Sequence, residues 1–105
     1  MFWNREKTAI IKPNDLAAEM VERRAPVIVD VRSEKDFQAG HLPGAINIPL
    51  EELDQRKDEL DPAVSTVFYW ARGMRSDQAG RQMKEKGFQR VFNLEGDIKA
   101  WKGGI

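Results

Sequence analysis

The sequence contains no cysteine and a single histidine, His41, among its 105 residues. Without cysteine, the chain can form no disulfide bond, no thiolate nucleophile and no thiolate metal site. One histidine is also too few for a histidine-rich metal site. We therefore expect the protein to use neither a metal nor another cofactor.

An excess of charge of one sign and long apolar runs are also missing. Lys and Arg together number 17, as do Asp and Glu, so the formal net charge is zero. A neutral chain has no overall attraction for nucleic acid or for an anionic membrane. No apolar run approaches the ~20 residues needed to cross a bilayer, and the N-terminus has no signal-peptide pattern. We expect a soluble, cytoplasmic protein with no nucleic-acid or membrane partner.

The length of 105 residues predicts a single domain over residues 1–105, large enough to bury a core without disulfide bonds. Residues 1–7 are expected to form a loosely ordered N-terminal extension, although Phe2 and Trp3 could pack on the domain or on a partner.

Signals for helices and strands alternate along the chain. Pro13 is expected to start a helix whose apolar face includes Leu16, Ala17, Met20 and Val21. Ser33 and Asp36 fit a capping box for a short helix that ends at Gly40. Further helices are expected over 49–61, over 76–86 and around Trp101, and strands over 27–31, 45–48, 67–69 and 91–94. This order, with strands that are almost continuously apolar, predicts an α/β domain with a largely parallel sheet.

Two unusual segments follow strands of the predicted sheet. Asp30-Val31-Arg32 ends one strand, and residues 70–75 follow another. Ligands of parallel α/β sheets bind beyond the carboxyl ends of the strands. The edge that these segments share is therefore the predicted functional location.

The segment Tyr69 to Ser76 is arranged as a strand end, a loop with Gly73 and two arginines, and a helix expected to open at Ser76. Backbone N–H groups and the positive end of the helix dipole would point at one place above this loop, which suits thiolates, persulfides and oxyanions. Position 70 holds a tryptophan, whose indole is not a nucleophile. Ser76 is expected to cap the helix rather than act as a nucleophile, because no histidine lies near it in sequence to act as a base.

Three ordered segments resemble the rhodanese-like family. They are Asp30-Val31-Arg32 with Phe37 and 40–49, the loop 70–76, and Leu94-Glu95-Gly96 with Trp101. The match covers roughly residues 8 to 103. The resemblance implies a five-stranded, mainly parallel sheet flanked by helices on both faces. In active members it also implies a loop cysteine that takes sulfane sulfur from a donor, such as the thiosulfate anion, and passes it on.

The chain departs from the family pattern at two positions. Trp70 stands where the family has its cysteine, and Asp97 stands where it usually has a second glycine. We expect Asp97 to cap the last helix. The tryptophan removes the sulfur carrier, so the chain as written is predicted to be inactive.

The resemblance also implies roles for the residues around position 70. Asp30 and Arg32 would support the site, and Arg75 would steady the ring of loop N–H groups, with Arg72 facing solvent. The predicted anion-binding loop comprises Ala71, Arg72, Gly73, Met74, Arg75 and Ser76.

Three other features have structural interpretations. His41 is expected to make a structural hydrogen bond in its Gly-His-Leu-Pro-Gly turn rather than act as a base. The indole of Trp70 is expected to fill the pocket rather than stand aside. The acidic stretch from Glu51 to Asp61 could receive a basic partner, but a solvated helix face is the default expectation.

Two functional classes remain. In the first, the parent is a sulfurtransferase and Trp70 is a replacement of its cysteine. In the second, the chain is a natural non-catalytic binding or regulatory module with a protein partner. The loop favours the first class, because a long-inactive module has little reason to keep Gly73, Arg75 and Ser76 together.

Overall fold

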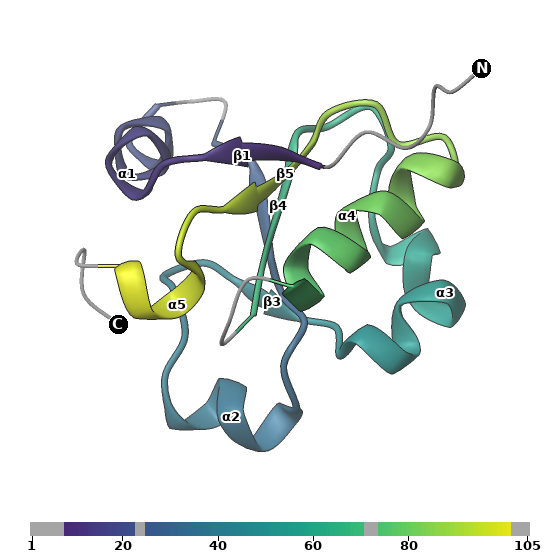
Figure 1. Ribbon diagram of the computed structural model, residues 1–105, viewed down its shortest axis with the longest axis horizontal. Helices are drawn as coiled ribbons and strands as arrows, with labels where there is room; N and C mark the ends of the chain where they lie inside the picture. Colours follow the sequence, from purple (N-terminus) through teal and green to yellow (C-terminus); the bar gives the residue numbers. More distant parts are fainter. Residues whose placement is uncertain (1–7, 23–24, 71–73, 102–105) are drawn as a thin grey trace.

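The computed structural model describes residues 8–22, 25–70 and 74–101, with the backbone alone for 74–76. Its strands form one five-stranded sheet in the order β1-β5-β4-β2-β3. Every neighbouring pair of strands is parallel, so the prediction of a mainly parallel sheet is confirmed. Figure 1 shows this sheet between two layers of helices.

The helices and strands follow the predicted order along the chain, except that the first strand, β1, was not among the strands predicted from residue patterns. The strands are β1 Ala9–Ile11, β2 Val27–Asp30, β3 Ile46–Asn47, β4 Thr66–Tyr69 and β5 Val91–Leu94. The α-helices are α1 Pro13–Met20, α2 Glu34–Ala39, α3 Leu53–Arg56, α4 Met74–Glu85 and α5 Asp97–Ala100, and two 3₁₀ turns, Leu50–Glu52 and Lys57–Glu59, flank α3.

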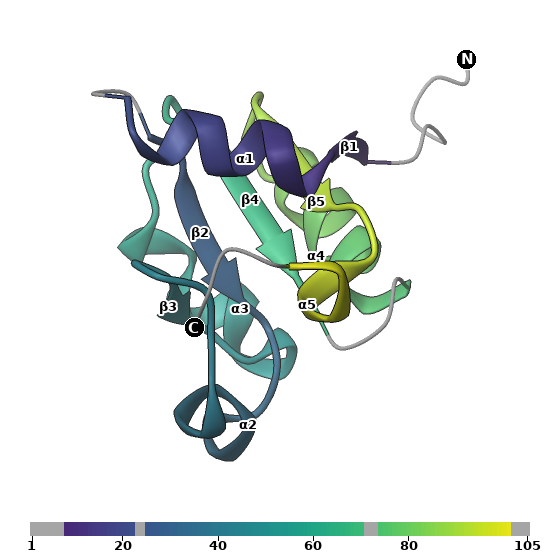
Figure 2. The same ribbon diagram turned by 90° about the vertical axis from the view of Figure 1, so that its left-hand side faces the viewer.

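The core has two halves, one on each face of the sheet. Val29, Phe68 and Val91 point to the face that α3 and α4 cover with Leu53 and Met83. On the opposite face, alternate residues of the same strands pack against α1, α5 and the turn after α2; they include Ile28, Val67, Tyr69 and Leu94 with Leu16, Leu42 and Trp101. Figure 2 shows α1 and α5 in front of the sheet and α3 and α4 behind it. Helices on both faces were predicted and are confirmed.

Two local predictions were wrong. The helix after the loop begins at Met74 rather than Ser76, so Ser76 is its third residue and not its cap. Val21 does not belong to the apolar face of α1, because it follows the last helical residue and is 86% exposed. The predicted helix start at Pro13 and the predicted cap at Ser33 are confirmed, since Pro13 is the first residue of α1 and the Ser33 hydroxyl accepts the Asp36 N–H.

Within the described ranges, no helix is long and apolar enough to span a membrane. In the same ranges, no group of three or more His, Asp or Glu side chains is placed to hold a metal ion.

Candidate functional site

The carboxyl end of β2 carries two buried charged groups. Asp30 is the last residue of β2 and is fully buried, and Arg32 lies two residues later. The Asp30 carboxylate accepts the backbone N–H of Arg32 at 2.8 Å, its Nε–H at 3.1 Å and its Nη2–H at 2.7 Å. A carboxylate and a guanidinium matched in this way satisfy each other where water is excluded. Asp30 and Arg32, the two residues expected to support the site, are thus paired with each other.

Arg32 connects this pair to the following turn. Its Nη2 also donates to the Gly40 carbonyl at 2.6 Å. Burial opposes the charge on Arg32, but the hydrogen bonds and charge of Asp30 outweigh it, so the pKa of Arg32 is raised. Arg32 therefore stays cationic, and its guanidinium hydrogen-bonds to groups of the protein itself. The support of the loop at residue 70 by Asp30 and Arg32 stays a prediction.

Asn47 and Tyr69 also hold the edge, and sequence reasoning missed both. Asn47 ends β3, and its side-chain amide donates to the carbonyls of Asp30 and Arg32 at 3.0 Å each. Tyr69 ends β4, and its buried hydroxyl accepts the Leu42 N–H at 3.1 Å. A signal was available, because each is a polar group at the carboxyl end of a predicted strand.

His41 has the structural role that was predicted. Its Nδ1 lies 2.8 Å from the Phe37 carbonyl oxygen, and its ring stacks on the Phe37 ring with centroids 3.7 Å apart. Because a carbonyl only accepts hydrogen bonds, this nitrogen carries the proton. Both contacts hold the turn after α2 against the helix, which is a structural role.

Trp70 directly follows β4 and reaches back to the core. Its side chain is partly buried and packs against the core half formed with α3 and α4. Its backbone carbonyl accepts the Ile98 N–H at 3.2 Å. The indole is therefore packed on the domain rather than free in solvent.

Asp97 does not cap the last helix as predicted. The cap position of α5 is Gly96, and no side chain hydrogen-bonds there. The buried Asp97 carboxylate instead accepts the backbone N–H of Trp70 at 2.8 Å. The two positions at which the chain departs from the family pattern are therefore joined directly by a hydrogen bond. The sequence showed both departures but not their contact.

The remaining loop predictions cannot be placed in full. Ala71, Arg72 and Gly73 lie outside the described residues. Met74, Arg75 and Ser76 form the first turn of α4, but their side chains are not described. What is described at the loop is its start at Trp70, its helical end at Met74 and the contact with α5.

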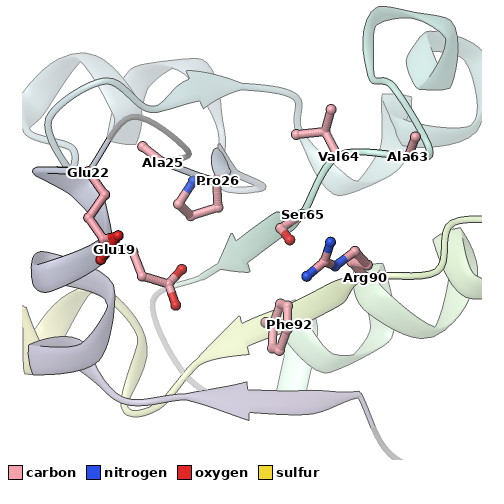
Figure 3. Close-up of a pocket in the computed structure, with 9 residues that line it drawn as sticks. All are labelled: Glu19, Glu22, Ala25, Pro26, Ala63, Val64, Ser65, Arg90 and Phe92. Atoms are coloured by element: carbon pink, nitrogen blue, oxygen red, sulfur yellow. The ribbon is translucent and has the colours of Figure 1, made fainter.

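A hollow lies at the other end of the sheet. A cavity of about 590 Å³ is bordered by residues at or before the amino ends of β2, β4 and β5, including Pro26, Ser65 and Arg90. Figure 3 shows Glu19 and Arg90 entering it from opposite sides. Both side chains are exposed, and they lie toward the amino ends of the strands, whereas Asp30 and Trp70 lie at the carboxyl ends. This hollow is not the predicted site.

The acidic stretch is a charged surface with internal ion pairs. Arg56 bridges Glu52 at 3.0 Å and Glu59 at 2.8 Å, and Lys86 pairs with Asp54. The bond from Arg56 lowers the pKa of Glu59, and the bond from Lys86 lowers the pKa of Asp54. These pairs fit the default expectation of a solvated face.

The model of the rhodanese-like domain family matches residues 13–103. The chain belongs to the rhodanese-like family. The matched segment covers nearly all of the described sheet, the Asp30 to Arg32 edge and the loop at Trp70. The resemblance drawn from the three sequence motifs is thereby confirmed.

Sequence relatives include proteins named for sulfur transfer. The protein YqhL of Bacillus subtilis is 37% identical over 82 residues, which are 78% of this chain and 65% of that protein. The thiosulfate sulfurtransferase GlpE of Coxiella burnetii is 28% identical over 86 residues, covering 82% of this chain and 80% of the relative. A sulfurtransferase of Allochromatium vinosum is 30% identical, covering 87% and 85%. The chain thus spans slightly less than two thirds of YqhL but most of the other two.

Solved structures share the fold. The Alr3790 protein of Anabaena superposes with a TM-score of 0.83 at 29% identity, covering 90% of this chain and 79% of that one. A rhodanese-like domain protein of Staphylococcus aureus gives a TM-score of 0.84 at 24% identity, covering 90% and 92%. The second likeness shows the fold alone.

Proposed function

We propose that this chain is a rhodanese-like domain derived from a sulfurtransferase parent and that it carries no sulfur as written. The observation that carries the proposal is Trp70, which occupies the position of the family's cysteine at the carboxyl end of β4 while the surrounding supports are kept. The Asp30 and Arg32 pair and the helix that begins right after the loop are parts of that support.

The parent chemistry explains why the tryptophan is decisive. A cysteine thiolate at position 70 would attack the outer sulfur of thiosulfate, the S–S bond would break, and sulfite would leave with the electron pair. The product would be a cysteine persulfide, from which cyanide would take the outer sulfur as thiocyanate and restore the thiolate. An indole offers no atom for the first step, and the chain has no cysteine to replace it.

The alternative is a natural binding module with a protein partner. The second departure from the family pattern, Asp97, favours this alternative, and its buried carboxylate accepts the backbone N–H of residue 70. A single replacement of cysteine in an active parent would account for Trp70 alone.

Restoring the cysteine tests the sulfurtransferase parent. Trp70→Cys is expected to gain the mass of one sulfur atom after incubation with thiosulfate and to lose it again to cyanide. Trp70→Ser is the matched control, because the serine side chain is similar in size to that of cysteine but has no sulfur atom with which to form a persulfide. The absence of sulfur uptake from every folded chain that carries cysteine at position 70 would contradict a sulfurtransferase parent and leave the binding module.

A further inference from the structure

The cavity at the amino ends of the strands is lined by charges of both signs. Glu19 and Glu22 border it at the end of α1 and in the turn that follows, and Arg90 borders it from the position before β5. Figure 3 shows the Glu19 carboxylate and the Arg90 guanidinium pointing toward each other across it, with the Phe92 ring to one side. Its volume of about 590 Å³ lies in the range of small-molecule sites.

Backbone hydrogen bonds hold both sides of this cavity in place. The Arg90 carbonyl accepts the Thr66 N–H at 2.9 Å, which joins the amino ends of β5 and β4. On the other side, the Glu22 N–H donates to the Glu19 carbonyl at 3.1 Å and closes the turn after α1. The two sides are therefore formed by the fold itself, before any ligand arrives.

The charged side chains of the cavity differ from other charged side chains on the surface. Arg56 and Arg81, which are less than half exposed, form ion pairs with nearby carboxylates at 3.0 Å and 2.9 Å. In the described ranges, the side chains of Glu19, Glu22 and Arg90 form no ion pair and no hydrogen bond, although they border one cavity. Opposite charges that share a cavity without meeting are available to a ligand that carries both charges at its two ends.

We propose that this cavity binds the C-terminal lysine of a partner polypeptide. The terminal carboxylate pairs with the planar Arg90 guanidinium, which matches it in shape. The lysine ammonium, which has three donors, binds the carboxylates of Glu19 and Glu22. The methylene groups between the two charges lie along the Phe92 ring. This inference involves no residue of the candidate site at position 70 and does not depend on sulfur chemistry.

The same chemistry favours a chain terminus over free lysine. Free lysine carries an α-ammonium beside its carboxylate, and this second cation would lie close to the Arg90 guanidinium and be repelled by it. In a polypeptide the corresponding nitrogen is an uncharged amide. The side chains of Glu19, Glu22 and Arg90 are exposed, so the rest of a partner chain can leave the cavity toward solvent.

Three small probes test the two ends of the ligand. Nα-acetyl-L-lysine mimics a C-terminal lysine, its C-terminal amide lacks the carboxylate, and Nα-acetyl-L-norleucine lacks the ammonium. Titration of the full chain with Nα-acetyl-L-lysine, followed by ¹H–¹⁵N NMR spectra, should shift the amides of Ser65 and Phe92 with a dissociation constant on the order of 1 mM. Each of the other two probes should bind roughly five-fold more weakly, as expected for the loss of one exposed ion pair.

Two substitutions assign the charges to the two ends. Arg90→Gln should weaken the binding of Nα-acetyl-L-lysine roughly five-fold and leave the binding of its amide unchanged. Glu19→Gln should weaken Nα-acetyl-L-lysine to a similar extent and leave Nα-acetyl-L-norleucine unchanged. Lys84→Gln is the matched control, because it removes a charge from an exposed side chain of α4 outside the cavity.

Three results would overturn the inference. Equal affinities for the three probes would show that the cavity does not recognise both ends. A titration that produces no saturable shift at Ser65 and Phe92 would contradict the location. Tighter binding of free L-lysine than of Nα-acetyl-L-lysine would contradict a chain terminus. Sulfur uptake by the Trp70→Cys chain is a separate measurement, so failure of this inference leaves the proposed function unaffected.

Discussion

Tyr69 is the only tyrosine of the chain and immediately precedes the residue at the candidate site. Its phenol is fully buried at the end of β4, accepts the Leu42 N–H and lies 5.7 Å from the Arg32 guanidinium. Burial raises its pKa above the ordinary value of 10.0, because a phenolate would lose its hydration. The hydrogen bond from the Leu42 N–H to the Tyr69 hydroxyl links β4 to the turn after α2.

The ionisation of Tyr69 can be followed in isolation because no second tyrosine interferes. Tyrosinate absorbance of the folded chain is expected to stay absent through pH 10, whereas the chain in urea should titrate near pH 10. The folded state then binds more protons above pH 10, so the contribution of Tyr69 to the free energy of unfolding should be constant below that pH and fall above it. Titration of the folded chain with the same midpoint as the unfolded chain would contradict a buried phenol.

At the residue scale, the sequence predicted the hydrogen bond of His41 and the place of Asp30 at a strand end, but not the contact of Asp97. A strand end in a parallel sheet fixes where Asp30 lies, and the family motif fixes the turn around His41. For Asp97 the sequence shows a carboxylate at a helix start, where capping is the usual result. Its actual partner, Trp70, is 27 positions away, and only the packing of α5 beside β4 brings the two together.

Among the elements, the short edge strand β1 depends on a close contact with α4. Thr8, just before β1, donates its N–H to the Asp77 side chain at 2.9 Å and its hydroxyl to the Asp77 carbonyl at 3.0 Å. Gly80, one turn along α4, lets the buried Thr8 side chain approach; a Cβ there would meet Thr8 atoms at 2.5 Å. Glycine is thus required inside this helix despite its low helix propensity.

Replacing this glycine tests that contact. Gly80→Ala should gain up to ~1 kcal/mol in helix propensity but lose roughly 1–3 kcal/mol to overpacking, so we expect net destabilisation. In a Thr8→Ala background the two closest clashes disappear, and the same substitution should become neutral or stabilising. Urea unfolding of the four chains measures the coupling. Additive effects would show that Thr8 and Gly80 do not constrain each other.

The prediction of elements succeeded where periodicity is strong and was less exact at their ends. The span of β5 was predicted residue for residue, because an apolar run after Gly87 leaves little freedom. The region after Pro49 was predicted as one helix but contains a short α-helix between two 3₁₀ turns. Its ends are held by Leu53 and Leu60 in the core, and that tertiary packing overrides local propensity.

For the whole molecule, parallel topology explains why the site could be located before the structure. Parallel strands bring their carboxyl ends to one edge, so Asp30 and Trp70 lie at the same edge of the sheet, at the ends of two neighbouring strands. The order β1-β5-β4-β2-β3 places β4 at the centre, and residue 70 therefore emerges from the middle of that edge. Sequence alone could not provide the side-chain contacts across it, because they depend on how α5 and the turn after α2 pack.

The measurement that tests the account most directly is sulfur transfer by the unmodified chain. After incubation with thiosulfate, its intact mass should be unchanged, and added cyanide should yield no thiocyanate above the level of buffer alone, because the chain has no cysteine to carry the sulfur. The Trp70→Cys chain, run in parallel, should gain sulfur. A thiocyanate signal that copurifies with the unmodified chain through stringent purification would contradict the claim that Trp70 has removed the sulfur carrier.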